Sequence, residues 1–207
     1  HWEFGRWIVA SALVWSVSMN FYPWFIDYFH GTHEAGIWAA GFTLVSLGNV
    51  FIMGVHNFLG PKIAAVYAAS GAVALRKFVF EAVLLLALPL AALCGFLYVA
   101  GPILLATLFG PDFVDASAVL VLLSLNLSAL GLGFVFSRGL FALERADLDF
   151  QVNFVPLVLL FAAGIPLVRA YEIRGAAWAL CLASGVALCC RVAAFLLAQP
   201  REEVVTG

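Results

Sequence analysis

The chain has 207 residues, of which 65% are hydrophobic and 11% are charged, and its formal net charge is −2. Soluble domains are about 45–50% apolar and about 25% charged, so this composition excludes an ordinary water-soluble domain. The small net charge gives no indication of nucleic-acid binding. We therefore expect an all-α membrane protein.

Six long apolar stretches, separated by short polar breaks, occupy almost the whole chain. Each approaches the ~20 residues that a helix needs to cross the hydrocarbon core of a bilayer. In lipid each must be helical, because unpaired backbone groups find no water there. No polar segment is long enough for a soluble domain, so residues 1–207 are expected to form a single six-transmembrane-helix bundle. Its spans are predicted at about residues 7–29, 36–59, 78–100, 116–143, 150–168 and 175–197.

Two segments between these spans are too short to cross a bilayer. Residues 60–71 carry a proline near their start and a glycine at their end, and residues 101–111 are similar. This placement of proline and glycine is typical of a helix. We expect both segments to form short helices that lie flat at the membrane surface.

The positions of lysine and arginine predict the orientation. Six spans place both termini on one side, and that side carries most of the basic residues, whereas the opposite side carries only Arg169 and Arg174. The positive-inside rule makes the richer side cytoplasmic. We expect a multi-pass membrane protein with both termini in the cytoplasm. Because the chain begins with His1 rather than Met, we interpret it as a part of a longer protein. The basic residues of the richer side are Arg6, Lys62, Arg76, Lys77, Arg145 and Arg201.

Polar side chains in the first two spans are candidates for function, because each is costly in lipid unless it faces a cavity or a partner. Asn20 and Asp27 share one helical face with Ser16 and Pro23. Asn20 is therefore a candidate cavity residue and Asp27 a candidate for ion coupling, although Asp27 also fits a simple position at the water interface. Asn49 lies deep in the second span and fits either a cavity or adhesion between helices.

The fourth and sixth spans carry arginine. Ser124, Ser128 and Arg138 fall on one face of the fourth span, and we predict that this face lines a cavity. An arginine deep in hydrocarbon costs about 2.5–3.5 kcal/mol, which snorkelling toward the cytoplasmic side reduces. For Arg138, and for Arg191 in the sixth span, both substrate binding and a structural role stay open. Asn126 occupies another face and is assigned to helix packing.

The sequence contains no pattern typical of catalysis. It has no Ser/His/Asp set, no carboxylate pair in a loop and no glycine-rich phosphate loop. The four cysteines lie in apolar stretches without metal-ligand spacing, and the loop that contains His30, His33 and Glu34 is not expected to bind a metal. We expect no enzymatic activity, no cofactor and no metal site.

Several short motifs occur in an order and spacing that resemble one transporter family. The chain resembles the C-terminal half of polysaccharide-biosynthesis proteins, the Wzx-like lipid-linked oligosaccharide flippases of the multidrug/oligosaccharidyl-lipid/polysaccharide exporter superfamily. The resemblance covers nearly the whole chain. Its motifs are Gly5-Arg6-Trp7, Gly60-Pro61-Lys62, Leu108-Phe109-Gly110-Pro111-Asp112-Phe113, Ala142-Leu143-Glu144-Arg145-Ala146, Ile165-Pro166-Leu167 and Ile173-Arg174-Gly175-Ala176-Ala177-Trp178-Ala179.

The resemblance implies that the chain is one lobe of a two-lobe transporter that works by alternating access. A lipid-linked glycan, as used in polysaccharide and lipopolysaccharide biosynthesis, would enter a cationic cavity between this lobe and an N-terminal lobe. Rocking of the lobes would then expose it on the far side of the bilayer, which the resemblance implies is a bacterial inner (plasma) membrane. Arg138 and Arg191 would be candidate contacts for its pyrophosphate, since guanidinium is well suited to phosphate.

Three other functions stay open. A drug or cation antiporter lobe of the same superfamily would be favoured by acidic residues deep in the cavity, for which Asp27 is the candidate. A membrane-embedded glycan enzyme would need larger outer loops or catalytic residues in them. A non-transporting helical subunit would bind only a partner protein.

Overall fold

A computed structural model describes the backbone of residues 2–199, with the side chains of residues 9, 10, 12–14, 16, 17 and 21–199. Over these residues the chain is helical almost throughout and has no strand, so the predicted all-α class is confirmed. The elements in chain order are α1 (Trp2–His30), α2 (Thr32–Leu108), the 3-10 turn η1 (Pro111–Ala116), α3 (Ser117–Ala142), α4 (Ala146–Leu159), the π-helical turn η2 (Leu160–Gly164) and α5 (Ile165–Leu197).

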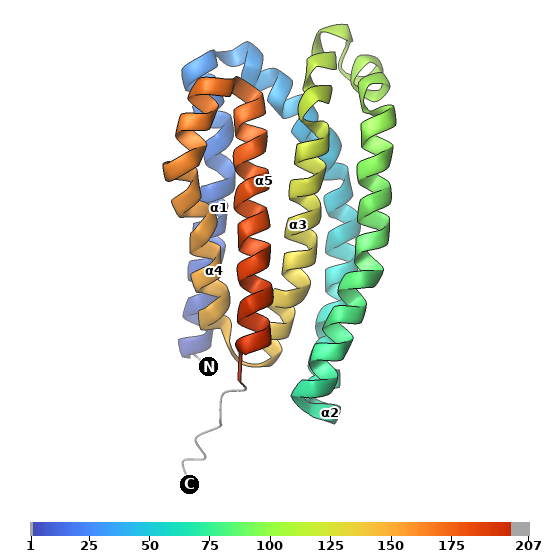
Figure 1. Ribbon diagram of the computed structural model, residues 1–207, viewed down its shortest axis with the longest axis vertical. Helices are drawn as coiled ribbons and strands as arrows, with labels where there is room; N and C mark the ends of the chain where they lie inside the picture. The colour runs from blue at the N-terminus through green and yellow to red at the C-terminus, as the bar shows by residue number, and fades with distance from the viewer. Residues whose placement is uncertain (1, 200–207) are drawn as a thin grey trace.

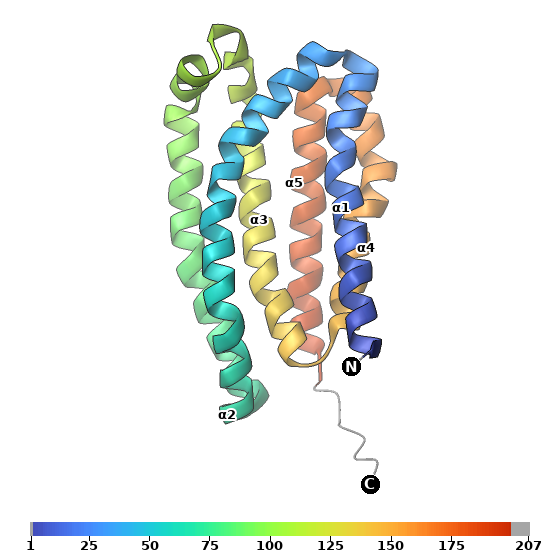
Figure 2. The same cartoon turned by 180° about the vertical axis from the view of Figure 1, so that it is seen from behind.

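Helix α2 folds back on itself at Gly71. Its 77 residues would reach about 115 Å if they were straight, several times the hydrocarbon thickness of a bilayer. Gly71 has φ 75° and ψ −172°, a conformation that is essentially open only to glycine. The two parts run side by side in opposite directions (Figures 1 and 2), and we call them the first arm (residues 32–70) and the second arm (residues 72–108).

A second reversal interrupts α5. The backbone leaves the helical region at Tyr171 (φ −131°, ψ 17°) and at Glu172 (φ 54°, ψ −137°). Gly175 makes room for this turn, because a Cβ at that position would overlap the carbonyl group of Leu167. Helix α4, η2 and the start of α5 therefore form one rod up to the turn, and residues 173–197 return as another.

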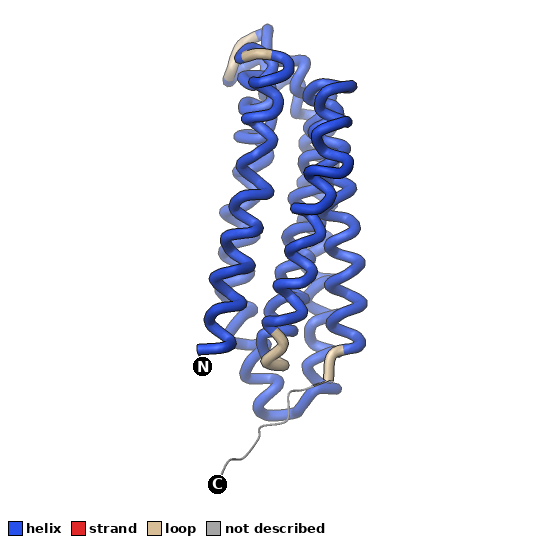
Figure 3. The backbone as a smooth tube through the Cα atoms, turned by 90° about the vertical axis from the view of Figure 1, so that its left-hand side faces the viewer, coloured by secondary structure: helices blue, strands red, loops and turns tan. Residues whose placement is uncertain are grey.

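The helical rods run along the long axis of the molecule, and the loops lie at its two ends (Figure 3). Helices α1, α4 and α5 form one group, and α3 stands between α5 and the arms of α2 (Figure 1). The start of α1, the turn of α2, the α3–α4 connection and the end of α5 share one end of the bundle (Figure 1). A hydrogen bond of 2.9 Å from Arg76 Nη2 to the carbonyl oxygen of Ala198 ties α2 to α5 there.

Residues 60–71 and 101–111 differ from the separate surface helices that we expected. The helical conformation of α2 continues through Pro61 as far as the turn at Gly71, and through Pro102 as far as Leu108. A proline removes one backbone hydrogen bond and bends a helix, but the helix can resume after it. The prediction of separate helices is therefore wrong, whereas the location of these segments at a membrane surface stays a prediction.

The described chain has the length and the surface of a membrane protein. Three helical stretches are long and apolar enough to cross a membrane: Thr32–Leu108, Pro111–Ala142 and Ala146–Leu197. Large apolar side chains also cover the outside of the bundle, among them Leu84 and Leu85, which are each 73% exposed. An apolar surface of this extent is unfavourable in water, so the fold is compatible with a location in lipid.

Replacing Gly71 tests the reversal of α2. We expect Gly71→Ala to lower the free energy of unfolding by about 1–3 kcal/mol, because a Cβ strains the backbone at this φ and ψ. The measurement is a denaturant titration of the purified protein in mixed micelles. Gly95→Ala is the matched control, since Gly95 is helical and has no atom within 4 Å of an added Cβ. Equal stability of both variants would contradict the assignment.

Candidate functional site

Two adjoining pockets lie between the first arm of α2 and α3. The pocket farther from the turn at Gly71, called the upper pocket, has a volume of about 270 Å³ and lies between these two elements alone. The lower one has a volume of about 400 Å³ and is also bounded by Ala12 of α1 and by Asp149 and Asn153 of α4. Met53 and Phe134 line both pockets. The two pockets therefore form one recess, which we call the central groove.

Ala12 of α1 and Met53 and His56 of the first arm line the lower pocket. These two rods diverge toward the end of the bundle that contains the turn of α2 (Figure 2). The upper part of the central groove is mostly apolar but carries two amides, those of Asn49 and Asn126. Asn126 is only 4% exposed, and its Oδ1 has no hydrogen-bond partner among the described residues. A buried amide oxygen without a partner costs about 1–3 kcal/mol. Such a cost requires an explanation other than stability.

The lower part of the central groove carries a cation. Arg138 is exposed and lines both this pocket and a neighbouring one of about 400 Å³ that reaches Gly60 and Pro61. His56 lines the same two pockets, and its Nε2 lies 3.1 Å from the carbonyl oxygen of Gly131. Among the described residues, no carboxylate lies within ion-pair distance of Arg138. Its guanidinium is therefore available to an anion in the groove.

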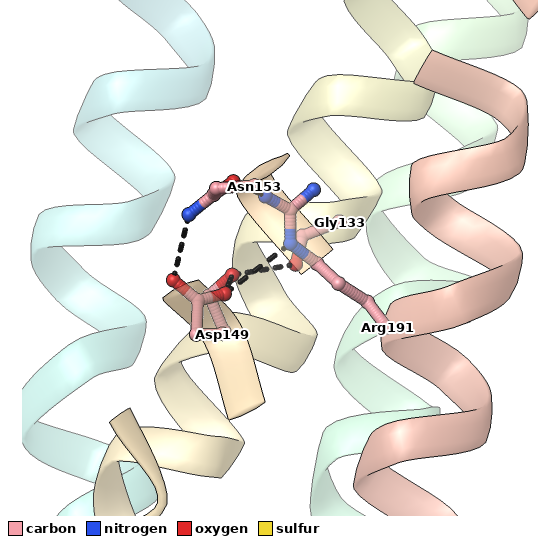
Figure 4. A network of polar contacts seen from close by, with 5 residues as sticks. Gly133, Asp149, Asn153 and Arg191 are labelled. Carbon is pink, nitrogen blue, oxygen red and sulfur yellow. Dashed lines mark hydrogen bonds and ion pairs between the residues drawn. The ribbon is translucent and has the colours of Figure 1, made fainter. Parts of the chain in front are cut away.

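Beside this pocket, a buried carboxylate is held by three donors (Figure 4). Asp149 Oδ1 accepts hydrogen bonds from Ser137 Oγ at 2.6 Å and from Arg191 Nε at 3.3 Å. Asp149 Oδ2 accepts one from Asn153 Nδ2 at 3.0 Å. Arg191 Nη2 also donates to Asn153 Oδ1. None of these four residues is more than 7% exposed, so together they form a closed polar network.

The polar network joins three helices, since Ser137 belongs to α3, Asp149 and Asn153 to α4, and Arg191 to α5. Gly133 leaves room for the guanidinium, because a Cβ there would lie 2.9 Å from Arg191 Nη1 (Figure 4). Burying two charges is expensive, and their attraction compensates only when the remaining polar atoms are also bonded. Here the hydroxyl and the amide supply those bonds, so the network fixes the mutual position of α3, α4 and α5.

The predicted serine face does not line the central groove. Ser124 Oγ donates to the carbonyl oxygen of Val121 at 2.8 Å, and Ser128 Oγ donates to that of Ser124 at 2.8 Å. Ser128 also lies 3.5 Å from Cys94 Sγ, on the second arm of α2. Both hydroxyls therefore donate to carbonyl oxygens of their own helix. Asn126, which we assigned to packing, is the residue of α3 that supplies a polar group to the upper groove.

The remaining candidates are distributed over the molecule. Asn49 and Arg138 line the central groove. Arg191 is 2% exposed and is paired with Asp149, which fits the structural role left open for it. Asp27 is exposed at the end of α1 and lines none of the pockets between α2 and α3. The side chain of Asn20 lies outside the described residues.

Sequence reasoning missed Asp149 and Asn153. The sequence predicts a fifth span that begins at residue 150, whereas α4 begins at Ala146 and includes Asp149. Their spacing of four residues does place both on one helical face, and this signal could have marked them as a polar pair. No group of three or more His, Cys, Asp or Glu in the described part of the chain could hold a metal ion.

Comparisons with known proteins add no identification. No family model matches the chain, and neither the curated proteins nor the solved structures contain a match. The resemblance to the flippase family therefore rests on the sequence motifs alone, and the function is inferred from the site.

Breaking the buried ion pair tests its structural role. We expect Arg191→Met to lower the free energy of unfolding by about 3–5 kcal/mol, because it leaves the Asp149 carboxylate buried without its cation. The double variant Asp149→Asn/Arg191→Met should lose less than the sum of the two single variants, since the second change removes the stranded charge. Denaturant titration in mixed micelles measures all three.

Lys77→Met is the matched control for this cycle. It breaks the ion pair between Lys77 and Glu81, whose Nζ and Oε1 atoms lie 3.9 Å apart on two exposed side chains. An exposed pair contributes up to about 1 kcal/mol. Strictly additive losses at Asp149 and Arg191 would show that the two side chains do not act as a unit.

Proposed function

We propose that this chain is a membrane-embedded lobe of a transporter that exports lipid-linked oligosaccharide or polysaccharide units. The observation that carries the proposal is the exposed Arg138 guanidinium on the wall of a groove between helices. The motif resemblance supplies the substrate class, and the groove supplies a place for the substrate to bind. A second, N-terminal lobe would close the open side of the groove.

The arrangement of the rods supports six crossings of the bilayer. The turns at Gly71 and at Tyr171–Glu172 divide α2 and α5, close to the breaks predicted between spans. An even number of crossings agrees with the start of α1 and the end of α5 lying at one end (Figure 1). Arg76 and Lys77, near the start of the second arm, and Arg145, in the α3–α4 connection, lie toward that end too, which favours a cytoplasmic location for it.

The chemistry of the groove suits a diphosphate-linked glycan. A planar guanidinium makes bidentate hydrogen bonds to phosphate oxygens, and Arg138 lies where the groove meets the predicted cytoplasmic end. The amides of Asn49 and Asn126 lie farther along the same groove, and amides pair well with sugar hydroxyls, since they both donate and accept.

The same geometry favours a cation antiporter less than it favours a glycan exporter. It requires an acidic group that is free to exchange its cation within the pathway. Asp27 is exposed outside the central groove, and Asp149, which does reach the lower pocket, already has Arg191 as its counter-ion.

Removing the Arg138 guanidinium tests the proposed transport of lipid-linked glycans. In vesicles that contain the full-length protein, we expect Arg138→Ala to slow translocation of a labelled lipid-linked glycan by about tenfold or more. We expect an effect of about tenfold because a hydrogen bond to a charged group contributes about 1.5–3 kcal/mol. Arg138→Lys should retain part of the rate, since the charge remains but the bidentate geometry does not.

Lys77→Ala is the control, because it removes an exposed cation at the same end of the bundle. Its rate should match that of the unaltered protein. Transport that is unchanged by Arg138→Ala, with normal protein levels in the vesicles, would remove Arg138 from the substrate pathway and with it the main support for this function.

A further inference from the structure

A second recess lies between the two arms of α2. It has a volume of about 670 Å³, and we call it the apolar furrow. Val50 and Phe58 on the first arm and Leu85 and Leu88 on the second arm are each more than 60% exposed, so the furrow opens to the outside of the bundle. Every side chain that lines it is apolar: Val50, Phe51, Gly54, Val55, Phe58, Leu59, Ala82, Leu85, Leu86, Leu88 and Pro89.

The furrow exists because small residues stand where the arms face each other. Gly54 has no side chain, and no atom lies within 4 Å of the position of an added Cβ. Ala82 lines the opposite wall, and Pro89 interrupts the hydrogen bonding of the second arm at the far end of the furrow. A proline inside a helix bends it away from the ideal axis. The recess is therefore a property of the sequence of α2.

A cation lies at one end of the furrow. Lys62 Nζ lies 4.0 Å from the centre of the Phe58 ring, and Phe58 is part of the furrow wall. On the second arm near this end, Lys77 is paired with Glu81 and Arg76 donates to the backbone of Ala198. Among the described residues, no carboxylate lies within ion-pair distance of Lys62.

We propose that the furrow and Lys62 bind one anionic phospholipid of the surrounding bilayer. One acyl chain lies in the furrow between the arms, and the phosphate lies against the Lys62 ammonium. The inference rests on the proposed membrane location of α2, but it concerns a site separate from the central groove.

The combination of the two features favours a lipid over other occupants. A free phosphate ion would use Lys62 but not an apolar recess, and an apolar helix of a partner would use the recess but not the cation. A phospholipid joins an acyl chain to a phosphate, and Lys62 lies near the end of the first arm, at the predicted membrane surface. Cations in such juxtamembrane positions attract anionic lipids.

Photolabelling tests the site directly. The full chain is incorporated into phosphatidylcholine vesicles with a trace of phosphatidylglycerol that carries a photoreactive group in its acyl chain. Labelled peptides are then mapped by mass spectrometry. We expect labelling to concentrate in residues 50–59 and 82–89, at several times the yield of a photoreactive phosphatidylcholine.

Two variants separate the roles of charge and shape. Lys62→Gln should reduce labelling by phosphatidylglycerol roughly fivefold, the effect expected of one cation at a bilayer surface, and should leave labelling by phosphatidylcholine unchanged. Gly54→Leu should reduce labelling by both lipids, because its side chain occupies the furrow. Lys77→Gln and Gly95→Leu are the matched controls, a paired cation and an open glycine outside the furrow, and neither should alter the labelling.

Other outcomes overturn the proposal. Equal labelling by the two lipids, or labelling by phosphatidylglycerol that Lys62→Gln does not change, would remove the headgroup site. Competition by millimolar inorganic phosphate would point to a free anion, and cross-links between two copies across the furrow would point to a protein partner. Arg138→Ala should leave the labelling unchanged, so failure of the lipid site and failure of glycan transport are distinguishable.

Discussion

Backbone amides surrounded by hydrocarbon must be hydrogen-bonded within the chain, because lipid offers them no partner. This constraint explains why the loops lie only at the two ends of the bundle (Figure 3). The glycines with positive φ, Gly31, Gly71 and Gly110, lie at breaks between helical rods and not inside them. The same constraint acts where a proline removes a donor. Pro156 lies inside α4, and the π-helical turn η2 begins four residues later at Leu160, yet the rod stays continuous through both.

The two arginines of the central region differ in how their charge is accommodated between apolar helices. Arg191 and Arg138 both lie on apolar helices, and the sequence leaves a structural role and a functional role open for each. Arg191 is neutralised by Asp149, which is 42 residues away in the sequence, and its side chain is enclosed by α3, α4 and α5. Arg138 remains exposed on a groove wall. The difference depends on a partner from another helix, and a single sequence does not show which helices are neighbours.

The sequence predicted the parts of the fold that depend on local composition. Helix α3 begins and ends within one residue of the span expected at residues 116–143, because a long apolar run bounded by polar residues has few alternatives in lipid. The continuation of α2 past Pro61 was missed, since a proline at the start of a short segment is also typical of a new helix. Local rules decide whether a segment is helical, but tertiary packing decides where one helix ends and the next begins.

The candidate site was harder to predict, because a helical face can be polar for two reasons. Hydroxyl groups such as those of Ser124 and Ser128 donate hydrogen bonds to carbonyl oxygens of their own helix. A row of serines on one helical face therefore does not require a cavity. Asn126, by contrast, lines the groove, and its Oδ1 has no hydrogen-bond partner among the described residues. The type of side chain alone does not identify a polar pathway either, since Arg138 lines the groove whereas Arg191 is enclosed between helices.

The first arm of α2 has two faces with different chemistry. Asn49, Met53 and His56 lie on one face and line the central groove, whereas Phe51, Val55 and Phe58 lie on the opposite face and line the apolar furrow. A helix that carried only polar residues would not remain in lipid, and one that carried only apolar residues would offer a substrate nothing to bind. The first arm of α2 therefore separates the two recesses and supplies one wall of each.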